Sequence, residues 1–151
     1  MFPSMNRQLQ GDLGEASARC WYELRGYVVL IPTGRSPDYD FVADDGERLI
    51  KVQVKTSGCM TPYGRYAVSI CTRGGNQSWS GLSKRFSSTR CDELFVVTID
   101  GRRWRIPATE VTATTAVSLG GARHAEFEVD PGQPLGAFLT VDSLLSPAAA
   151  G

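Results

Sequence analysis

Two short apolar strands joined by a tight turn constrain the fold of this 151-residue chain more than any other feature. Residues 36–43 and residues 49–56 each read as a strand, and the Asp-Gly pair between them is typical of a hairpin turn. Because side chains two positions apart on a strand point the same way, Gln53 and Lys55 share one face of the second strand. The hairpin is therefore expected to bring Asp40 close to both of them.

An acid, an amide oxygen and an ammonium in one place suit a particular chemistry. Carboxylate and amide oxygens can ligate a hard divalent cation, and a lysine beside a metal and a phosphate can orient water or stabilise developing negative charge. This is the minimum set for hydrolysing a phosphodiester. Each residue also has an ordinary interpretation: Asp40 as a turn residue after Pro37, and Gln53 and Lys55 as the solvated face of a strand. Asp38 is the competing metal-ligand candidate, because alternation places it on the face of Asp40.

Length and composition predict a single domain over residues 1–146, followed by a flexible tail over residues 147–151. The hydrophobic fraction of 42% is enough for one core, and no apolar run approaches the length of a membrane span. The N-terminus lacks an apolar signal segment. Four scattered cysteines and one histidine argue against a zinc site. Reduced thiols and a cytoplasmic location fit this pattern, although the even number of cysteines leaves disulfides open.

The charges are unevenly distributed, although the net charge is zero. Residues 60–105 carry eight Lys/Arg and three Asp/Glu, a surplus of +5, whereas residues 106–151 carry −4. The basic third is a candidate surface for phosphate contacts, and an ordinary solvated face is the alternative. The expected nucleic-acid-binding residues are Arg35, Arg73, Lys84 and Arg85.

Local patterns predict the remaining elements. Residues 6–25 have helical periodicity and are followed by Gly26, a good terminator. Gly11 and Gly14 weaken the helix and suggest that its backbone closely approaches another part of the molecule. Residues 27–31 read as a buried strand. The other expected elements are strands at 66–72, 93–99 and 103–107, a long loop or a poor helix at 73–90, a short helix or a crossover at 109–115, an edge strand at 126–129 and a weak helix at 135–145.

The order of these motifs resembles the PD-(D/E)XK nuclease superfamily. The residues that carry the resemblance are Gly11-x-x-Gly14-Glu15 on the helix, the following Gly-Tyr strand, Tyr39-Asp40-Phe-Val, and Gln53-Val-Lys55-Thr. The chain looks most like the branch in which glutamine replaces the acid before x-Lys, which includes bacterial intron-encoded homing endonucleases. Archaeal Holliday-junction resolvases share the same order. The resemblance covers roughly residues 6–57 and extends more loosely over residues 93–111.

The resemblance implies an α/β fold like that of restriction endonucleases, with a central mixed sheet flanked by helices, and Mg²⁺-dependent cleavage of DNA, with Mn²⁺ as a substitute. It makes Glu15 the helix acid and Lys55 the catalytic lysine. It makes Asp40 and Gln53 metal ligands, together with the carbonyl of Val54. The neutral Gln53 costs the site one negative charge and so weakens its attraction for the cation.

Three functions are weighed from the sequence. The leading hypothesis is a metal-dependent DNA endonuclease that works as a homo-oligomer, a dimer or tetramer, because cutting both strands needs two sites. The alternatives are a structure-selective nuclease like the Holliday-junction resolvases and a non-catalytic nucleic-acid-binding or assembly protein with the same fold.

Overall fold

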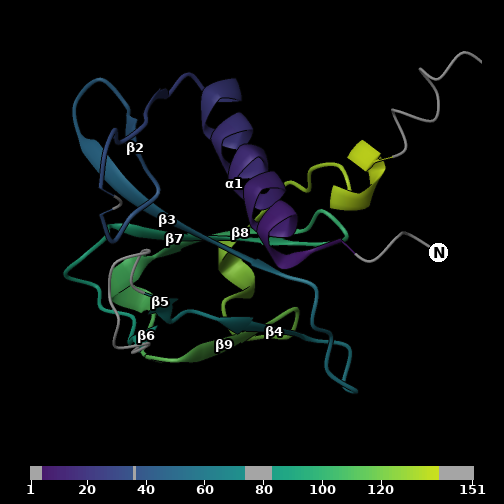
Figure 1. Cartoon of the computed structure of the whole chain (residues 1–151). Coiled ribbons are helices and arrows are strands. Elements are labelled where there is room, and N and C mark those ends of the chain that lie inside the picture. The colour runs from purple at the N-terminus through teal and green to yellow at the C-terminus, as the bar shows by residue number, and fades with distance from the viewer. Residues whose placement is uncertain (1–4, 36, 74–82, 140–151) are drawn as a thin grey trace, which may run out of the picture.

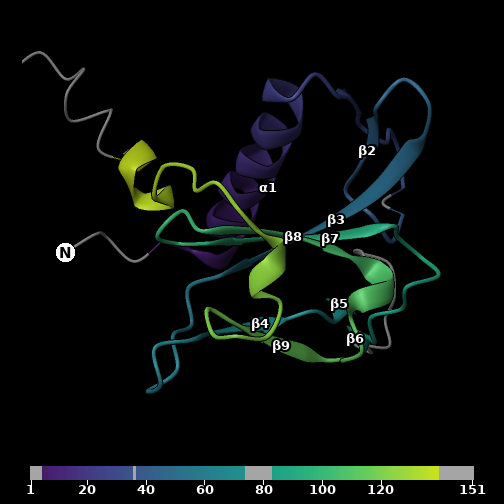
Figure 2. The same ribbon diagram turned by 180° about the vertical axis from the view of Figure 1, so that it is seen from behind.

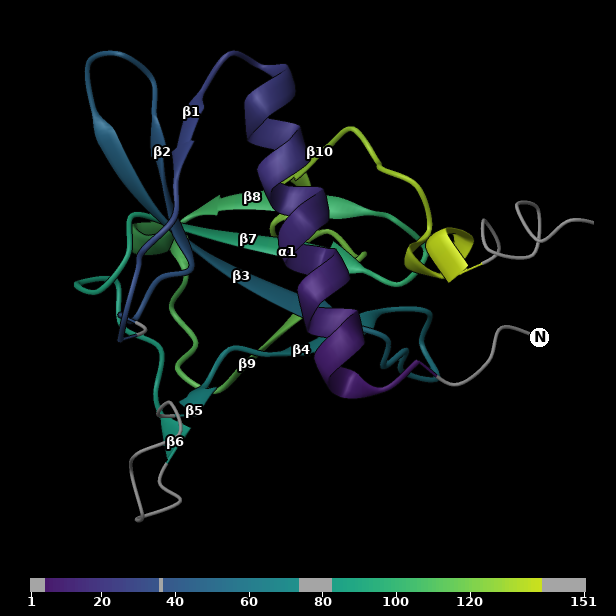
Figure 3. The ribbon, with the colours of Figure 1, turned by 45° about the horizontal axis from the view of Figure 1, so that its top comes forward.

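A six-stranded mixed sheet forms the centre of the molecule (Figures 1 and 3). The structure is a computed structural model that describes residues 5–35, 37–73 and 83–139. Strands β3 and β7 are parallel, and all other neighbours are antiparallel. The central mixed sheet implied by the resemblance is thereby confirmed. In spatial order the strands are β1 (Val28–Leu30), β2 (Phe41–Asp44), β3 (Leu49–Ser57), β7 (Glu93–Thr98), β8 (Arg103–Pro107) and β10 (Glu128–Val129).

Helix α1 (Arg7–Leu24) lies across one face of this sheet (Figure 3). Asn6 caps it, since its side chain accepts a hydrogen bond from the Leu9 N–H at 2.7 Å. Gly26, with φ of 85°, follows its last turn. The helix buries Ala18, Trp21 and Tyr22 against the apolar side chains Phe41, Ile50, Val52, Phe95 and Val97 of the sheet. This core fixes the helix over the middle strands. No helix within the described ranges is long and apolar enough to span a membrane.

Gly14 sets how closely α1 approaches β3. A Cβ atom on Gly14 would lie 1.9 Å from Thr56 Oγ1, which is closer than any real contact. The expectation of close approach is confirmed here. Gly11 is different, because a Cβ there would meet no atom within 4 Å.

Strands cover the opposite face of the sheet (Figure 2). β4 (Tyr66–Ser69) and β9 (Ala116–Leu119) form an antiparallel pair, and their side chains pack with Leu94, Val96 and Trp104 in a second core. In the described part of the chain no α-helix covers this face, and the pair of strands takes that place. The reason is local: residues 66–70 and 116–119 alternate between buried and exposed positions with the period of a strand.

One edge of β3 is left open beyond the hairpin. β2 pairs with β3 only as far as Phe41 and Val52, whereas β3 continues to Ser57 along its parallel neighbour β7. No strand of the described ranges pairs with this edge after Val52. The open edge lies beneath α1 and leaves room for side chains from both layers.

Several element predictions differ from the structure. The strand predicted at residues 27–31 is present as β1, but its predicted burial is wrong, because β1 is an outer strand of the sheet and Val28 and Leu30 are 57% and 44% exposed. β9 was not predicted. The segment 73–90, predicted as a long loop or a poor helix, starts in β5 (Thr72–Arg73) and contains β6 (Ser83–Lys84), which pair with each other. Residues 74–82 lie outside the described ranges, and residues 85–90 form no helix.

Within the described residues the remaining helical segments are three short 3-10 helices: η1 (Ala108–Glu110), η2 (Ala125–Phe127) and η3 (Leu135–Leu139). η1 occupies part of the segment for which a short helix or a crossover was predicted. η3 begins where the weak helix was expected, and residues 140–151, including the predicted tail, lie outside the described ranges.

Candidate active site

Asp40 closes the hairpin onto the open edge of β3. Its backbone N–H donates to the Val52 carbonyl at 2.8 Å, and its Oδ2 accepts from the Val54 N–H at 2.6 Å. Because the N–H and C=O of one strand residue point to the same edge, the Val54 carbonyl also faces this side. Burial raises the pKa of Asp40, against the lowering effects of the Val54 hydrogen bond and the charge of Lys55.

Glu15 comes to the same place from α1. It is half-buried and pairs with Arg19 one turn along the helix at 3.0 Å. Burial raises the pKa of Glu15, and the negative charge of Asp40 adds to the effect. The folded chain therefore holds the protons of both carboxyl groups more tightly than the unfolded chain, and its stability falls as the pH rises through these pKa values. A cation bound by the two carboxylates would offset this loss of folding stability.

Gln53 and Lys55 lie on one face of β3, as their spacing predicts. The Lys55 Nζ donates to the Cys71 carbonyl at 2.9 Å, and the Gln53 Nε2 donates to Thr72 Oγ1 at 2.7 Å. Burial lowers the pKa of Lys55, and the charge of Asp40 acts in the opposite direction. Both side chains thus contact consecutive residues just after β4, which links the two layers beside the open edge.

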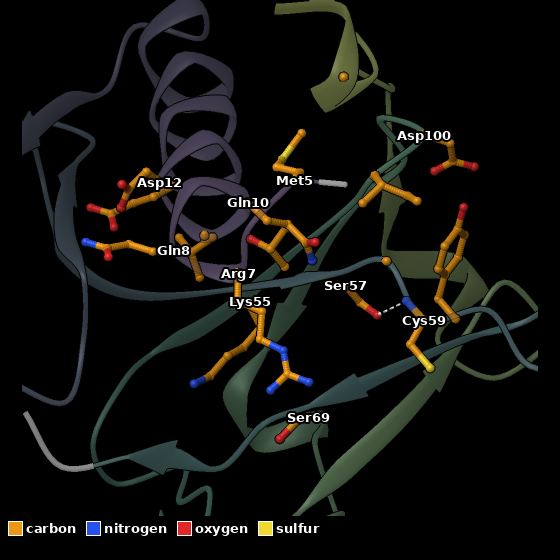
Figure 4. Close-up of a pocket in the computed structure, with 18 of the residues that line it drawn as sticks. Met5, Arg7, Gln8, Gln10, Asp12, Lys55, Ser57, Cys59, Ser69 and Asp100 are labelled. Carbon is orange, nitrogen blue, oxygen red and sulfur yellow. Dashed lines mark hydrogen bonds between the residues drawn. The ribbon is translucent and has the colours of Figure 1, made fainter. Parts of the chain in front are cut away.

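A groove of about 1230 Å³ runs along this edge between α1 and β4 (Figure 4). Glu15, Asp40, Val54 and Lys55 line it, but Gln53, which is only 6% exposed, is not among its lining residues. The groove therefore joins side chains from the helix, the start of β2 and the far half of β3. It continues past the first turns of α1 and the end of β3, where its lining residues include Arg7, Gln8, Gln10, Asp12, Ser57, Cys59 and Asp100.

Sequence reasoning missed Arg7 and Asp12. Asp12 precedes Glu15 by three residues, and Gln8 precedes Asp12 by four, so these residues follow the polar stripe of α1 that carries Glu15. The helical spacing alone indicates that these residues lie near Glu15. That this face of α1 lines the groove follows only from the orientation of α1 over β3.

The oxygen atoms in the groove match a hard cation. The donors are the carboxylates of Glu15 and Asp40 and the carbonyl of Val54, a set that suits Mg²⁺ or Mn²⁺ better than zinc. In the described ranges no three Asp, Glu, His or Cys side chains come together to hold a metal. The neutral Gln53 next to Val54 accounts for the missing third acid. The residues present therefore fit a divalent cation with fewer protein charges than three carboxylates would supply.

Asp38 and Asp40 have different partners in the structure, although alternation placed them on one face. Asp38 pairs with Lys84 at 3.5 Å and with Arg90 at 3.7 Å, and it is not among the residues that line the groove. The structure thus brings Asp40, not Asp38, to Glu15 and Lys55. Of the predicted DNA-contacting residues, Arg35, Lys84 and Arg85 are exposed, and the side chain of Arg73 lies outside what the structure describes.

Comparison with known proteins identifies the family. The sequence model of the PD-(D/E)XK endonuclease family matches residues 5–104. The chain belongs to the PD-(D/E)XK endonuclease family. The matched range contains the groove residues Glu15, Asp40 and Lys55, and the predicted resemblance is confirmed. No curated protein matches the chain.

A solved structure supports the same fold. The bacterial homing endonuclease I-Ssp6803I is similar with a TM-score of 0.63, at 20% sequence identity, over 92% of this chain and 93% of that chain. At this identity the likeness concerns the fold. Together, family and fold support a nuclease function in general terms for this PD-(D/E)XK protein.

Proposed function

We propose that this PD-(D/E)XK protein is a metal-dependent endonuclease that hydrolyses phosphodiester bonds in DNA. The observation that carries the proposal is the convergence of Glu15, Asp40 and Lys55 in one groove, although they come from three separate elements. Two carboxylates with raised pKa values beside a lysine form a site for a cation and a phosphate, and an ordinary solvated face would not bury them.

Each residue then has a role. Asp40 and the Val54 carbonyl would hold Mg²⁺ or Mn²⁺, with Glu15 as an additional ligand or the acceptor of a proton from water. The cation, when bound, supplies Lewis acidity and lowers the pKa of a coordinated water. Lys55 would orient the attacking water or stabilise the negative charge that develops on the phosphate.

Gln53 would contribute through its oxygen. Its Nε2 donates to Thr72, so Oε1 is the atom it can offer to a cation. A neutral ligand attracts a cation less than a carboxylate does, so we expect weaker metal binding than in a site with an acid at this position. The burial of Gln53 away from the groove favours one competing function, a DNA-binding protein that keeps the fold but does not cut.

We also propose that the active form is a homo-oligomer, with the dimer as the smallest that suffices. One groove can cut one strand at a time, and a symmetric pair supplies the second. The subunit count can be measured by light scattering in the presence and absence of DNA.

The test is cleavage of supercoiled plasmid and of a four-way junction with Mg²⁺, with Mn²⁺ and with a chelator. We expect cation-dependent nicking of the plasmid. The Asp40→Asn variant should lose calorimetric Mg²⁺ binding and at least about 10²-fold in rate, because an amide cannot replace the main anionic ligand. Its carbonyl oxygen can still accept the Val54 hydrogen bond, so the fold should persist.

Asp38→Asn is the matched control and should keep both metal binding and cleavage. A strong preference for the junction would favour the resolvase-like alternative. DNA binding without cleavage under every cation would favour the non-catalytic alternative and overturn the proposed endonuclease.

A further inference from the structure

We propose that Arg7 is a phosphate-binding residue of the groove, which holds the DNA backbone beside Lys55. The inference rests on the proposed function and adds a substrate contact to it. Arg7 is the first residue of α1 and lines the same groove as Lys55. In Figure 4 the guanidinium of Arg7, from α1, and the ammonium of Lys55, from β3, both extend toward Ser69 on β4.

The position of Arg7 is built into the fold. Asn6 caps α1 through the Leu9 N–H, which fixes the first turn where Arg7 begins the helix. Two turns later Gly14 lies directly against Thr56 of β3. The capped end of α1 is therefore held over the far half of β3, which fixes the backbone of Arg7 beside the groove and leaves its exposed side chain free to reach a ligand.

Arg7 is also an unpaired cation, unlike most arginines on the structured elements. Within the described ranges no carboxylate lies within 4.0 Å of its guanidinium, and no hydrogen bond occupies it. By contrast, ion pairs engage Arg19, Arg25, Arg102, Arg103 and Arg105. An arginine that lines a groove and has no internal acid is available for an anion from outside.

The charges of the groove explain what that anion would be. Asp12, Glu15 and Asp40 make one part of the groove acidic and would repel a nucleic-acid backbone. Lys55 and Arg19, which pairs with Glu15, still leave one of these three negative charges unbalanced. The planar guanidinium of Arg7 can donate two parallel hydrogen bonds to the non-bridging oxygens of a phosphodiester, which a single ammonium cannot do. Arg7 would thus position the strand while Lys55 acts at the cut.

The experiment measures duplex DNA binding by the full chain at several salt concentrations, without divalent cation so that nothing is cut. We expect Arg7→Ala to bind about tenfold more weakly and to flatten the slope of log K against log salt by about 0.9, the value for one phosphate contact. Arg7→Lys should keep the slope, because the charge remains, and lose part of the affinity.

Arg48→Ala is the matched control, since it removes the same charge from the exposed end of the β2–β3 hairpin. It should leave the slope unchanged.

If Arg7→Ala binds with the slope of the parent protein, or if Arg7→Ala and Arg48→Ala change the slope equally, the assignment of Arg7 is wrong, whatever the cleavage assay gives. If the parent binds DNA but never cuts it, the endonuclease proposal fails while the slope still decides on Arg7. If the parent does not bind DNA, both are overturned.

Discussion

At the scale of single residues, Lys55 is the most direct test of the chemistry. Lys55→Ala should lower the cleavage rate by a factor of about 10² or more, because the ammonium that acts on the water or the phosphate is lost. Folding and DNA binding should be largely retained. The lysine gives up one hydrogen bond, to the Cys71 carbonyl, and it takes no part in either apolar core. Single-turnover cleavage in Mg²⁺ gives the rate.

Lys51→Ala is the control for this variant. Lys51 lies on the same strand, is exposed and extends over the ring of Tyr39 at 5.6 Å rather than into the groove. It should cut at the parent rate. Equal rates for the parent and Lys55→Ala would show that Lys55 has no catalytic role.

Gln53→Glu separates metal binding from packing. The new carboxylate can accept a hydrogen bond from the Thr72 hydroxyl, so the contact between the layers is kept with its direction reversed. We expect the variant to be active and to bind Mg²⁺ more tightly, since it restores a negative ligand. Without metal, the melting temperature of the variant should fall relative to the parent as the pH rises from 5 to 8, because a buried acid has a raised pKa and ionising it costs stability.

Calorimetry and thermal melts, each at several pH values with and without Mg²⁺, decide this prediction. A folded Gln53→Glu protein with no activity would mean that Gln53 serves a purpose other than ligation. Unchanged Mg²⁺ affinity would place position 53 outside the metal site, in agreement with its absence from the groove lining.

At the scale of elements, the contact between α1 and β3 links stability to function. Gly14→Ala should destabilise the fold by about 1–3 kcal/mol, because the added carbon would lie 1.9 Å from Thr56 Oγ1 and the helix must shift. The shift would also move Glu15, so the cleavage rate should fall by more than the loss of folded protein explains. Denaturant melts and rates per folded molecule measure the two effects.

Gly11→Ala is the matched control on the same helix. Nothing lies within 4 Å of the position its Cβ would take, so it should stabilise the helix by up to about 1 kcal/mol. The double variant Gly14→Ala/Thr56→Ala should recover part of the lost stability, since it removes the atom in closest conflict. Gly14→Ala with parent-like stability would mean that the helix does not depend on this contact.

Local chemistry explains which elements the sequence predicted well. The Asp-Gly hairpin and the capped helix are fixed by neighbours in the chain, and so is the shared face of Gln53 and Lys55. The parallel pairing of β3 with β7 joins residues about forty positions apart, which no local pattern specifies. The sequence did not predict β9 for a related reason. Its short Ala-Val-Ser-Leu segment is a strand only because β4 pairs with it.

Some residues of the candidate site could likewise be predicted from local sequence, and others could not. Asp40 and Lys55 could be chosen from the hairpin alone, and the helix acid from the family resemblance. Arg7 could not, because its place in the groove depends on how α1 crosses the sheet. Alternation along the strand placed Asp38 and Asp40 on one face, so the sequence kept Asp38 as a competing metal-ligand candidate. The ion pairs of Asp38 with Lys84 and Arg90 now separate the two carboxylates physically.

At the scale of the whole molecule, the uneven charges of the sequence partly cancel in space. The acidic last third supplies Glu128 and Asp130, which pair with Arg102 and Arg103 of the basic middle third. Arg105 pairs with Glu93 beside the core. The surplus of +5 along the sequence is therefore not a single basic surface. Exposed cations of this third include Lys84 and Arg90, which both pair with Asp38 just before β2, and Arg85 beside Lys84 in the chain.

The double variant Lys84→Ala/Arg85→Ala tests whether the exposed positive charge of this segment contacts DNA. If both side chains contact phosphates, each contributes about 0.9 to the slope of log K against log salt, so the slope should flatten by roughly 2 and all duplexes should bind more weakly. Lys84 now pairs with Asp38 at 3.5 Å on the surface, a contact weak enough to be exchanged for a phosphate. Arg48→Ala/Arg123→Ala removes the same charge elsewhere and should leave the slope unchanged. Equal slopes for the parent and both double variants would reduce Lys84 and Arg85 to surface charge, and DNA contacts would then have to come from the groove itself.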